Sequence, residues 1–185
     1  MVDVSEASDT ELVARVLAGE RDAYAGLVAR YRDRLGRYAV RMLGNRSDAE
    51  DAVQETFVRG YRSLGRCTDP ERFGAWLFGI LVNRCRTLGA QRARRERVHV
   101  ADESALLRAA TRDDPVGRQA LREVIDAALV RLAPTLREAF LLKFVEEMSY
   151  EEMATMLGAS VPALKMRVSR ARAELRQILS EANHA

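Results

Sequence analysis

The chain has 185 residues, of which 48% are hydrophobic and only 6% aromatic. This composition can form one medium core or two small ones, and it favours aliphatic helix packing over a sheet. Four prolines and 11 glycines are too few for a fold of many short strands and turns. The formal charge is only +3, but the charged residues are segregated along the chain, and such segregation indicates charged partners.

The cysteines, the apolar runs and the first residues indicate where in the cell the protein is expected to act. Cys67 and Cys85 lack the CxxC spacing of a zinc site and are too few for a disulfide framework. No apolar run reaches the roughly 20 residues that span a bilayer, and the first residues, MVDVSEASDTE, are too acidic for a signal peptide. We therefore expect a cytoplasmic protein with no membrane span.

The first half predicts four amphipathic helices between about residues 9 and 92. Ser8 begins a Ser-x-x-Glu capping box and Ser47 begins a second, a pattern in which serine and glutamate satisfy each other's backbone N–H groups. Asp69 with Pro70 predicts the fourth start, because proline is tolerated in a first turn. The residues expected to face the core are Leu12, Val13, Val16 and Leu17; Ala23, Leu27, Tyr31, Leu35, Tyr38 and Met42; Ala49, Val53, Phe57 and Tyr61; and Phe73, Leu77, Ile80, Leu81, Arg84 and Leu88.

Residues 98–116 differ from the segments on either side. They have weak periodicity, net negative charge and a proline near the end, which predicts a flexible linker. We therefore expect an all-α protein of two small helical domains, residues 1–97 and 117–185, joined by this linker. The first helix of the second domain is expected to face inward with Leu121, Val124, Ile125, Ala128, Leu129 and Leu132.

The second domain contains a predicted helix-turn-helix at residues 149–175. Ser149 starts a third capping box, and Gly158 can end that helix in a left-handed conformation. Ser160 can cap the next helix, with Pro162 in its first turn. Two helices joined by a turn of three or four residues form a helix-turn-helix.

A helical wheel divides the second of these helices into a core face and an exposed face. The core face is Leu164, Val168, Ala171 and Leu175. If the amino-terminal end enters a major groove, as such helices do, the residues nearest the bases are Pro162, Ala163, Lys165, Met166, Ser169 and Arg170, while Arg167, Arg172 and Arg176 suit phosphates. A solvated basic face is the alternative, but the cap, turn and core stripe coincide with the basic residues, which favours DNA binding.

The first domain carries a basic surface. Asn83 lies seven residues after Trp76 on one helical stripe, and it is the better candidate for touching a base, whereas Trp76 has a simple core role as its alternative. Basic residues beside aromatic ones suit a separated DNA strand, and their binding would depend strongly on salt. A frayed, solvated helix end is the other interpretation. The basic residues are Arg84, Arg86, Arg92, Arg94, Arg95 and Arg97.

The same domain carries an acidic cluster at Asp48, Glu50, Asp51 and Glu55. Acidic residues near a helix start interact favourably with the helix dipole, which is a sufficient explanation for the first of them. Gln54 and Glu55 lie beyond the first turn, and a protein-binding surface explains them better.

Three segments give the chain a resemblance to a known family. DAEDAVQETFVRGY, FGAWLFGILVNRCRTLGAQRARR and LAPTLREAFLLKFVEEMSYEEMATMLGASVPALKMRVSRARAEL resemble the polymerase-binding helix, the promoter-melting segment and the −35-binding domain of the extracytoplasmic-function (ECF) group of bacterial sigma factors. They occur in the family's order, with a linker between, and cover nearly the whole chain.

The resemblance implies an initiation factor with no catalytic residue, cofactor or metal. The first domain would bind the β′ clamp coiled coil of core RNA polymerase through Asp51, Gln54 and Glu55, with Asp48 in the same cluster. It would recognise and melt the −10 element through Asn83, Trp76 and the basic residues named above, and residues 63–69 would shape a pocket for a flipped-out base.

The resemblance implies further contacts for the rest of the chain. The linker would run toward the active-site cleft and the RNA exit channel, and the second domain would bind the β flap and the −35 element. Family members commonly have an anti-sigma factor as a partner, which no residue here identifies.

The reading helix departs from the family's usual pattern. Pro162, Ala163 and Met166 stand where relatives often have Gly, Thr and Ser, whereas Lys165 and Arg167 match. Apolar side chains can contact thymine methyls and basic ones can reach guanine acceptors. We therefore expect a −35 preference that mixes G and T contacts and differs from that of relatives.

Two other classes of function compete with this interpretation. A dimeric helix-turn-helix regulator would bind duplex DNA, but it would need neither the basic segment nor the acidic cluster of the first domain. A helical enzyme would need a catalytic group, and the sequence offers only His99 in the linker and His184 near the end, with no nucleophile–base pair, metal cluster or phosphate loop.

Overall fold

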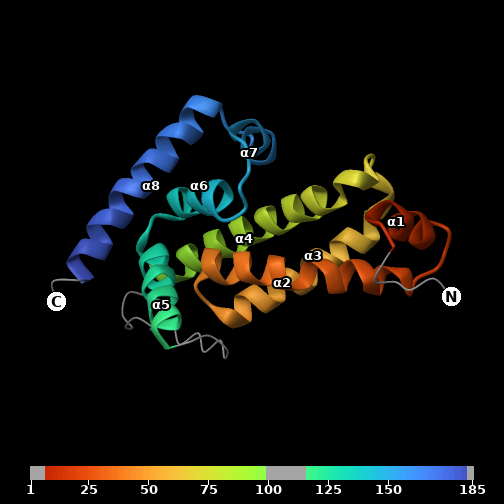
Figure 1. The fold of residues 1–185 in the computed structure, drawn as a ribbon, viewed down its shortest axis with the longest axis horizontal. Helices are drawn as coiled ribbons and strands as arrows, with labels where there is room; N and C mark the ends of the chain where they lie inside the picture. Colours follow the sequence, from red (N-terminus) through yellow and green to blue (C-terminus); the bar gives the residue numbers. More distant parts are fainter. Residues whose placement is uncertain (1–6, 99–115, 183–185) are drawn as a thin grey trace. The chain divides into compact units, whose positions relative to one another are not determined.

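The computed structural model describes residues 7–98 and 116–182, and all the regular structure in these ranges is helical (Figure 1). The described chain divides into two compact units. One consists of the residues up to Val40 together with Arg46–Val98, and the other of Arg41–Asn45 together with the carboxy-terminal helices. The all-α prediction is confirmed. Of the predicted linker, residues 98 and 116 are the described ends of two helices, and residues 99–115 lie outside the described ranges.

The first unit contains four α-helices and two short 3₁₀ turns. Their bounds are α1 Asp9–Leu17, α2 Ala23–Leu43, α3 Arg46–Arg62, η1 Leu64–Arg66, η2 Pro70–Arg72 and α4 Phe73–Val98. The long helix α4 packs along α3, and this is the most extensive helix pair of the unit. The largest fully buried side chains are Leu12, Leu27, Leu35, Tyr38, Phe73, Leu77, Phe78 and Leu81.

A capping box and the half-buried Asp9 fix the position of α1 in this unit. Ser8 and Glu11 form the predicted capping box, with the Glu11 N–H donating to Ser8 Oγ at 3.2 Å. Asp9 then accepts hydrogen bonds from Arg30 and Tyr31 of α2. These bonds connect α1 to α2 through side chains, and α1 also packs on the turns η1 and η2.

The structure corrects two sequence predictions in the first unit. Helix α3 begins at Arg46, so Ser47 lies inside the first turn and does not cap it, and the Glu50 carboxylate accepts from Arg46 Nε at 2.9 Å instead. Helix α4 buries more than the predicted stripe, because it also covers Phe78, Val82 and Cys85. A single stripe is too narrow for a helix enclosed by several neighbours.

The second unit contains α5 Val116–Arg131, α6 Pro134–Phe144, α7 Tyr150–Leu157 and α8 Val161–Ala182. Helix α8 packs against α5, α6 and α7. The buried Arg137 side chain donates to the carbonyl oxygens of Leu129 at 2.7 Å and Leu132 at 3.0 Å, which satisfies acceptors left open where α5 ends. The core is formed by Leu129, Leu132, Leu141, Leu142, Met153, Leu164 and Val168.

Among the described residues, four that were predicted to face the core are exposed, and Tyr61 of α3 is one of them. Leu17 of α1 is 59% exposed, and in α5 Val124 and Ile125 are 43% and 38% exposed. Periodicity locates an apolar stripe on a helix, but it does not fix how far around the helix the neighbours reach.

Candidate nucleic-acid interface

The predicted helix-turn-helix is present, and local chemistry sets both of its ends. The Ser149 N–H donates to Glu152 Oε2 at 2.8 Å and the Glu152 N–H donates to Ser149 Oγ at 3.1 Å, completing the capping box of α7. Helix α7 ends at Gly158, whose φ of 61° and ψ of 35° are left-handed. Ser160 Oγ then accepts from the Ala163 N–H at 3.4 Å at the start of α8.

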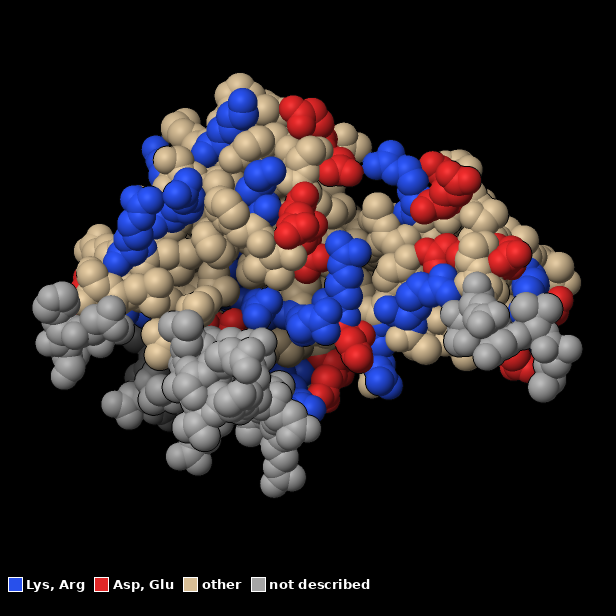
Figure 2. All heavy atoms as spheres, in the orientation of Figure 1, with Lys and Arg blue, Asp and Glu red and all other residues tan. Residues whose placement is uncertain are grey.

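Burial along α8 agrees with the helical wheel. Leu164, Val168, Ala171 and Leu175 are all buried, and they hold α8 against the rest of the unit. The opposite face therefore projects its side chains outward along the helix. On the face shown in Figure 2, Lys and Arg side chains gather over α8.

Most residues predicted to contact the −35 element lie on that outward face. Pro162, Lys165, Met166, Ser169, Arg170 and Arg172 are exposed, whereas Ala163 and Arg167 are half-buried. Met166 is 57% exposed, which leaves this large apolar side chain available for contact with a partner. The arrangement offers an apolar tip flanked by cations at the amino-terminal end of α8.

Two aromatic residues support these cations, and the sequence analysis did not identify either. Lys165 Nζ lies 5.6 Å from the centroid of the Tyr150 ring, and Lys143 Nζ lies 4.9 Å from it. The Arg172 guanidinium lies 5.8 Å from the Phe144 centroid. These are cation–π distances. Tyr150 opens α7, so only the tertiary packing of α7 on α8 brings it beside Lys165.

The predicted −10 residues lie on α4. Asn83 is exposed, and its backbone carbonyl accepts from Thr87 Oγ1 at 3.0 Å. Trp76 is half-buried, with its ring centroid 5.7 Å from that of Phe73. Arg92 and Arg94 are exposed and Arg86 is half-buried, whereas the side chain of Arg95 lies outside the described residues.

Arg84 differs from the other basic residues of α4. Its side chain is only 17% exposed, and its Nη2 lies 2.6 Å from Glu55 Oε2 on α3. Arg84 and Glu55 were assigned to different surfaces by the sequence analysis. The fold joins them in one ion pair between α3 and α4.

The predicted polymerase-binding residues form a row on α3. Asp51 and Gln54 are exposed, Asp48 is half-buried, and the Glu55 side chain is 33% exposed. The row continues with Val58 and Tyr61, which are 47% and 39% exposed. It joins carboxylates at one end to apolar side chains at the other.

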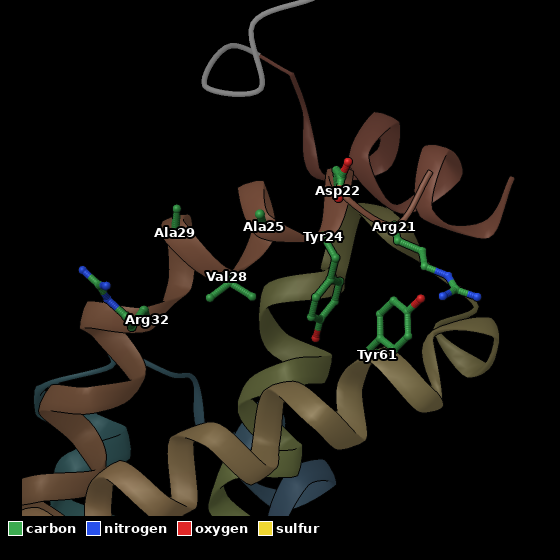
Figure 3. Close-up of a pocket in the computed structure, with 8 residues that line it drawn as sticks. All are labelled: Arg21, Asp22, Tyr24, Ala25, Val28, Ala29, Arg32 and Tyr61. Carbon is green, nitrogen blue, oxygen red and sulfur yellow. The ribbon is translucent and has the colours of Figure 1, made fainter. Parts of the chain in front are cut away.

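The exposure of Tyr61 corrects the prediction that it faces the core. Tyr24 takes the inner position, since its hydroxyl donates to the Phe57 carbonyl at 2.8 Å and its ring packs edge-on against Tyr61 at 5.1 Å. Burial raises the pKa of the Tyr24 hydroxyl. Tyr61 is left at the mouth of an open groove of about 630 Å³ between α2 and α3 (Figure 3). The groove is lined by Arg21, Asp22, Tyr24, Ala25, Val28, Ala29, Arg32 and Tyr61.

The segment predicted to shape a base pocket contains η1 and the cap of η2. Asp69 Oδ1 accepts from the Glu71 N–H at 3.2 Å, as expected of a helix cap. Cys67 is buried, and its thiol lies 3.5 Å from the Asp69 carbonyl oxygen. Burial raises the pKa of this thiol, which lowers its reactivity at neutral pH.

Two further features bear on the kind of site. Within residues 7–98 and 116–182, no group of His, Cys, Asp and Glu has an arrangement that could hold a metal ion. None of the helices described there is long and apolar enough to cross a bilayer.

Comparison with known proteins identifies the family. Residues 27–96 match the Sigma-70 region 2 model and residues 122–175 match the Sigma-70, region 4 model. RNA polymerase sigma factor CnrH of Cupriavidus metallidurans is 36% identical over 186 residues, covering 94% of this chain and 95% of that protein. ECF RNA polymerase sigma factor SigW of Bacillus subtilis is 28% identical over 180 residues, covering 91% of this chain and 95% of that protein.

Solved structures agree with the sequence comparison. The sigma factor RpoE of Bartonella quintana, in complex with the anti-sigma factor NepR, superposes with a TM-score of 0.70 at 26% identity, covering 85% of this chain and 96% of that one. CnrH in complex with the cytosolic domain of CnrY superposes with a TM-score of 0.65 at 30% identity, covering 97% and 99%. The chain belongs to the sigma-70 family of RNA polymerase sigma factors, within its ECF group.

Proposed function

We propose that this protein is an alternative sigma factor that binds core RNA polymerase and directs it to promoters with particular −10 and −35 elements. The observation that carries the proposal is the presence, in one chain, of a region 2 match and a region 4 match whose helix-turn-helix exposes a basic face. In this role the protein performs no catalytic step, since the polymerase does the chemistry, and it acts in the cytoplasm with that enzyme.

Under this proposal, residues 1–97 bind the clamp and the −10 element, residues 98–116 link the units, and residues 117–185 bind the −35 element and the β flap. The exposed row on α3 is suited to the clamp coiled coil, because it offers a carboxylate at Asp51 and apolar contacts at Val58 and Tyr61. Interfaces typically combine an apolar centre with a polar rim.

The −35 element is the target that we assign to α8. Lys165 and Arg170 can reach guanine acceptors, and Ala163 and Met166 can contact thymine methyls. The 57% exposure of Met166 supports its part in this readout. Substituting Met166 by Ser is expected to change the base preference at one or more −35 positions, and an unaltered preference at every position would remove Met166 from the interface.

The −10 element is the target that we assign to α4. Asn83 is exposed beside Arg86 and on the stripe of Trp76, so it can offer an amide to an unpaired base while nearby cations attract the phosphates. Asn83→Ala is expected to impair recognition of the −10 element more than that of the −35 element. Equal losses on promoters altered in either element would contradict the assignment.

Control by an anti-sigma factor is also part of the proposal. Both solved structures described above are complexes of a sigma factor with such a partner or a domain of it. An anti-sigma factor must compete with the polymerase, so the same surfaces are expected to bind one or the other.

The direct test is reconstitution. The purified protein is mixed with core RNA polymerase, the complex transcribes genomic DNA, and the transcripts are sequenced to identify the promoters. We expect initiation at a defined set of start sites sharing two elements. A protein that bound duplex DNA alone and ignored core polymerase would instead be a helix-turn-helix regulator.

The polymerase-binding surface can be tested with a matched control on the same helix. Asp51→Ala combined with Gln54→Ala is expected to weaken binding to core polymerase. Glu50→Ala removes a comparable exposed acid, which pairs with Arg46 at 2.9 Å, and it is expected to bind normally. Equal affinities of the double variant and the control would remove this surface from the proposal.

A further inference from the structure

The ion pair between Glu55 and Arg84 connects the helix that we assign to polymerase binding with the helix that we assign to the −10 element. Arg84 Nη2 lies 2.6 Å from Glu55 Oε2, and the two side chains are 17% and 33% exposed. Arg84 is the residue after the exposed Asn83. The ion pair therefore holds α4 against α3 at the residue next to Asn83.

Both oxygens of the Glu55 carboxylate are used within the protein. Oε2 pairs with Arg84, and Oε1 accepts from Arg59 Nε at 2.8 Å. Arg59 lies one turn further along α3 and its side chain is 56% exposed. The carboxylate thus lies between one cation of its own helix and one cation of α4.

The surroundings of Arg84 limit its freedom to act elsewhere. Its Nε is buried and has no hydrogen-bond partner among the described residues. The adjacent Cys85 is buried, and so is Leu81 one turn earlier. A partly buried ion pair is screened by solvent much less than an exposed one, and removing one partner leaves the other charge poorly compensated.

We propose that Glu55 and Arg84 form a brace between α3 and α4 that sets the position of Asn83 for −10 readout. Arg84 is then a positioning residue and not a DNA contact, and Glu55 serves the brace and not a direct salt bridge to the polymerase. This inference rests on the proposed function, in which α4 reads the −10 element.

The brace and a direct phosphate contact predict different results. If Arg84 contacts a phosphate, substituting it should reduce the slope of log affinity for single-stranded DNA against log salt concentration by about 0.7. Substituting Glu55 should then have no effect. A brace predicts that Arg84 and Glu55 substitutions cause the same defect, that the double variant is no worse than either, and that the salt slope is unchanged.

The experiment uses holoenzyme assembled with saturating core polymerase. Its probes are two fluorescent single DNA strands. The first carries the −10 sequence found by transcript sequencing. The second differs from it at one base, which is the base that the Asn83→Ala variant discriminates less well than the wild type does. Arg84→Gln, Glu55→Gln and the double variant are compared. The measured quantity is the ratio of affinities for the two bases, which a general loss of fold stability does not alter because both strands bind the same protein.

We expect each single variant and the double variant to lose about three- to tenfold in this ratio, which lies in the lower part of the range for residues coupled in one ion-pair network. Arg59→Gln is the matched control, because it removes the other cation from Glu55 but does not link two helices, and its ratio is expected to stay within twofold of the wild-type value. A lower salt slope for Arg84→Gln, or additive losses in the double variant, would overturn the brace.

Two further variants keep the inference testable. If a glutamine variant does not fold, the reversed pair Glu55→Arg with Arg84→Glu is expected to restore discrimination relative to the reversed single variants, and losses that add would overturn the brace. Asn83→Ala separates the two proposals. If it alters no −10 discrimination, the −10 assignment and the brace both fail; if it acts while Arg84→Gln and Glu55→Gln do not, the brace alone fails.

Discussion

Gly158 offers a direct test of how the turn holds the reading helix. It ends α7 with a φ of 61° and a ψ of 35°, and its N–H donates to the Ala154 carbonyl at 3.0 Å. A Cβ built on Gly158 would meet no heavy atom within 4 Å. Replacing Gly158 by Ala therefore adds no clash, and its cost arises from the backbone conformation alone.

The magnitude follows from two opposing terms. An L-residue in the left-handed region costs about 1–2 kcal/mol, and the reduced freedom of the unfolded chain offsets about 0.4–1 kcal/mol of this. We expect Gly158→Ala to lose about 1 kcal/mol of stability in the second unit. This corresponds to about a fivefold increase in the population of the open state at 25 °C.

Hydrogen–deuterium exchange of peptides from α7 and α8 measures that population, and exchange there is expected to be about fivefold faster in Gly158→Ala. Gly158→Asn is expected to be affected less, because asparagine tolerates the left-handed region better. Gly36→Ala is the control: Gly36 lies inside α2, a Cβ there meets nothing within 4 Å, and its φ is not positive. We expect it to stabilise the first unit by about 0.5–1 kcal/mol. Unchanged exchange in Gly158→Ala, or an asparagine variant worse than alanine, would refute the reasoning.

Three more predictions concern side-chain contacts of α1, α2 and α4 in the first unit. A Cβ at Gly74 would lie 2.7 Å from the Tyr31 ring, so Gly74→Ala should lower the free energy of unfolding by about 1–3 kcal/mol. Urea unfolding, monitored by the fluorescence of the single tryptophan, measures this change, and an unchanged midpoint would contradict the contact. Burial is the larger cause and the hydrogen bond to Asp9 the second cause that raise the pKa of Tyr31 to about 12. The stability that the neutral Tyr31 contributes is therefore complete below pH 10 and is lost as the pH rises toward 12. Stability curves of Tyr31→Phe and wild type that stay parallel over this range would exclude the effect. Hydrogen bonds from Ser8, first from its backbone N–H and second from its side chain, lower the pKa of Glu11. The stability that the ionised Glu11 contributes is therefore present above the ordinary pKa of a glutamate, and it is lost as the pH falls through the pKa of Glu11 in the folded protein. NMR titration should show that Ser8→Ala moves the pKa part of the way back, and an identical titration would exclude a role for the hydroxyl.

Two sequence predictions failed for reasons that concern neighbours and not propensity. The Ser47 pattern matches a capping box as well as the Ser8 pattern does, but α3 begins at Arg46, ahead of Ser47, and Glu50 pairs with Arg46. Tyr61 fits an inward stripe, but the Tyr24 side chain occupies the inner position. In both cases a second arrangement was locally acceptable, and contacts with other residues decided between the two.

The amino-acid sequence by itself determined the all-helical class, the two sigma-factor regions and the helix-turn-helix. These depend on local chemistry, since the cap at Ser149, the left-handed Gly158 and the apolar stripe of α8 act within a few residues of one another. Only the tertiary structure decided that Arg84 pairs with Glu55 and that Tyr150 lies beneath Lys165. Such pairs depend on how two helices pack. The helical period of one helix carries no information about which side chains of the second helix will contact it.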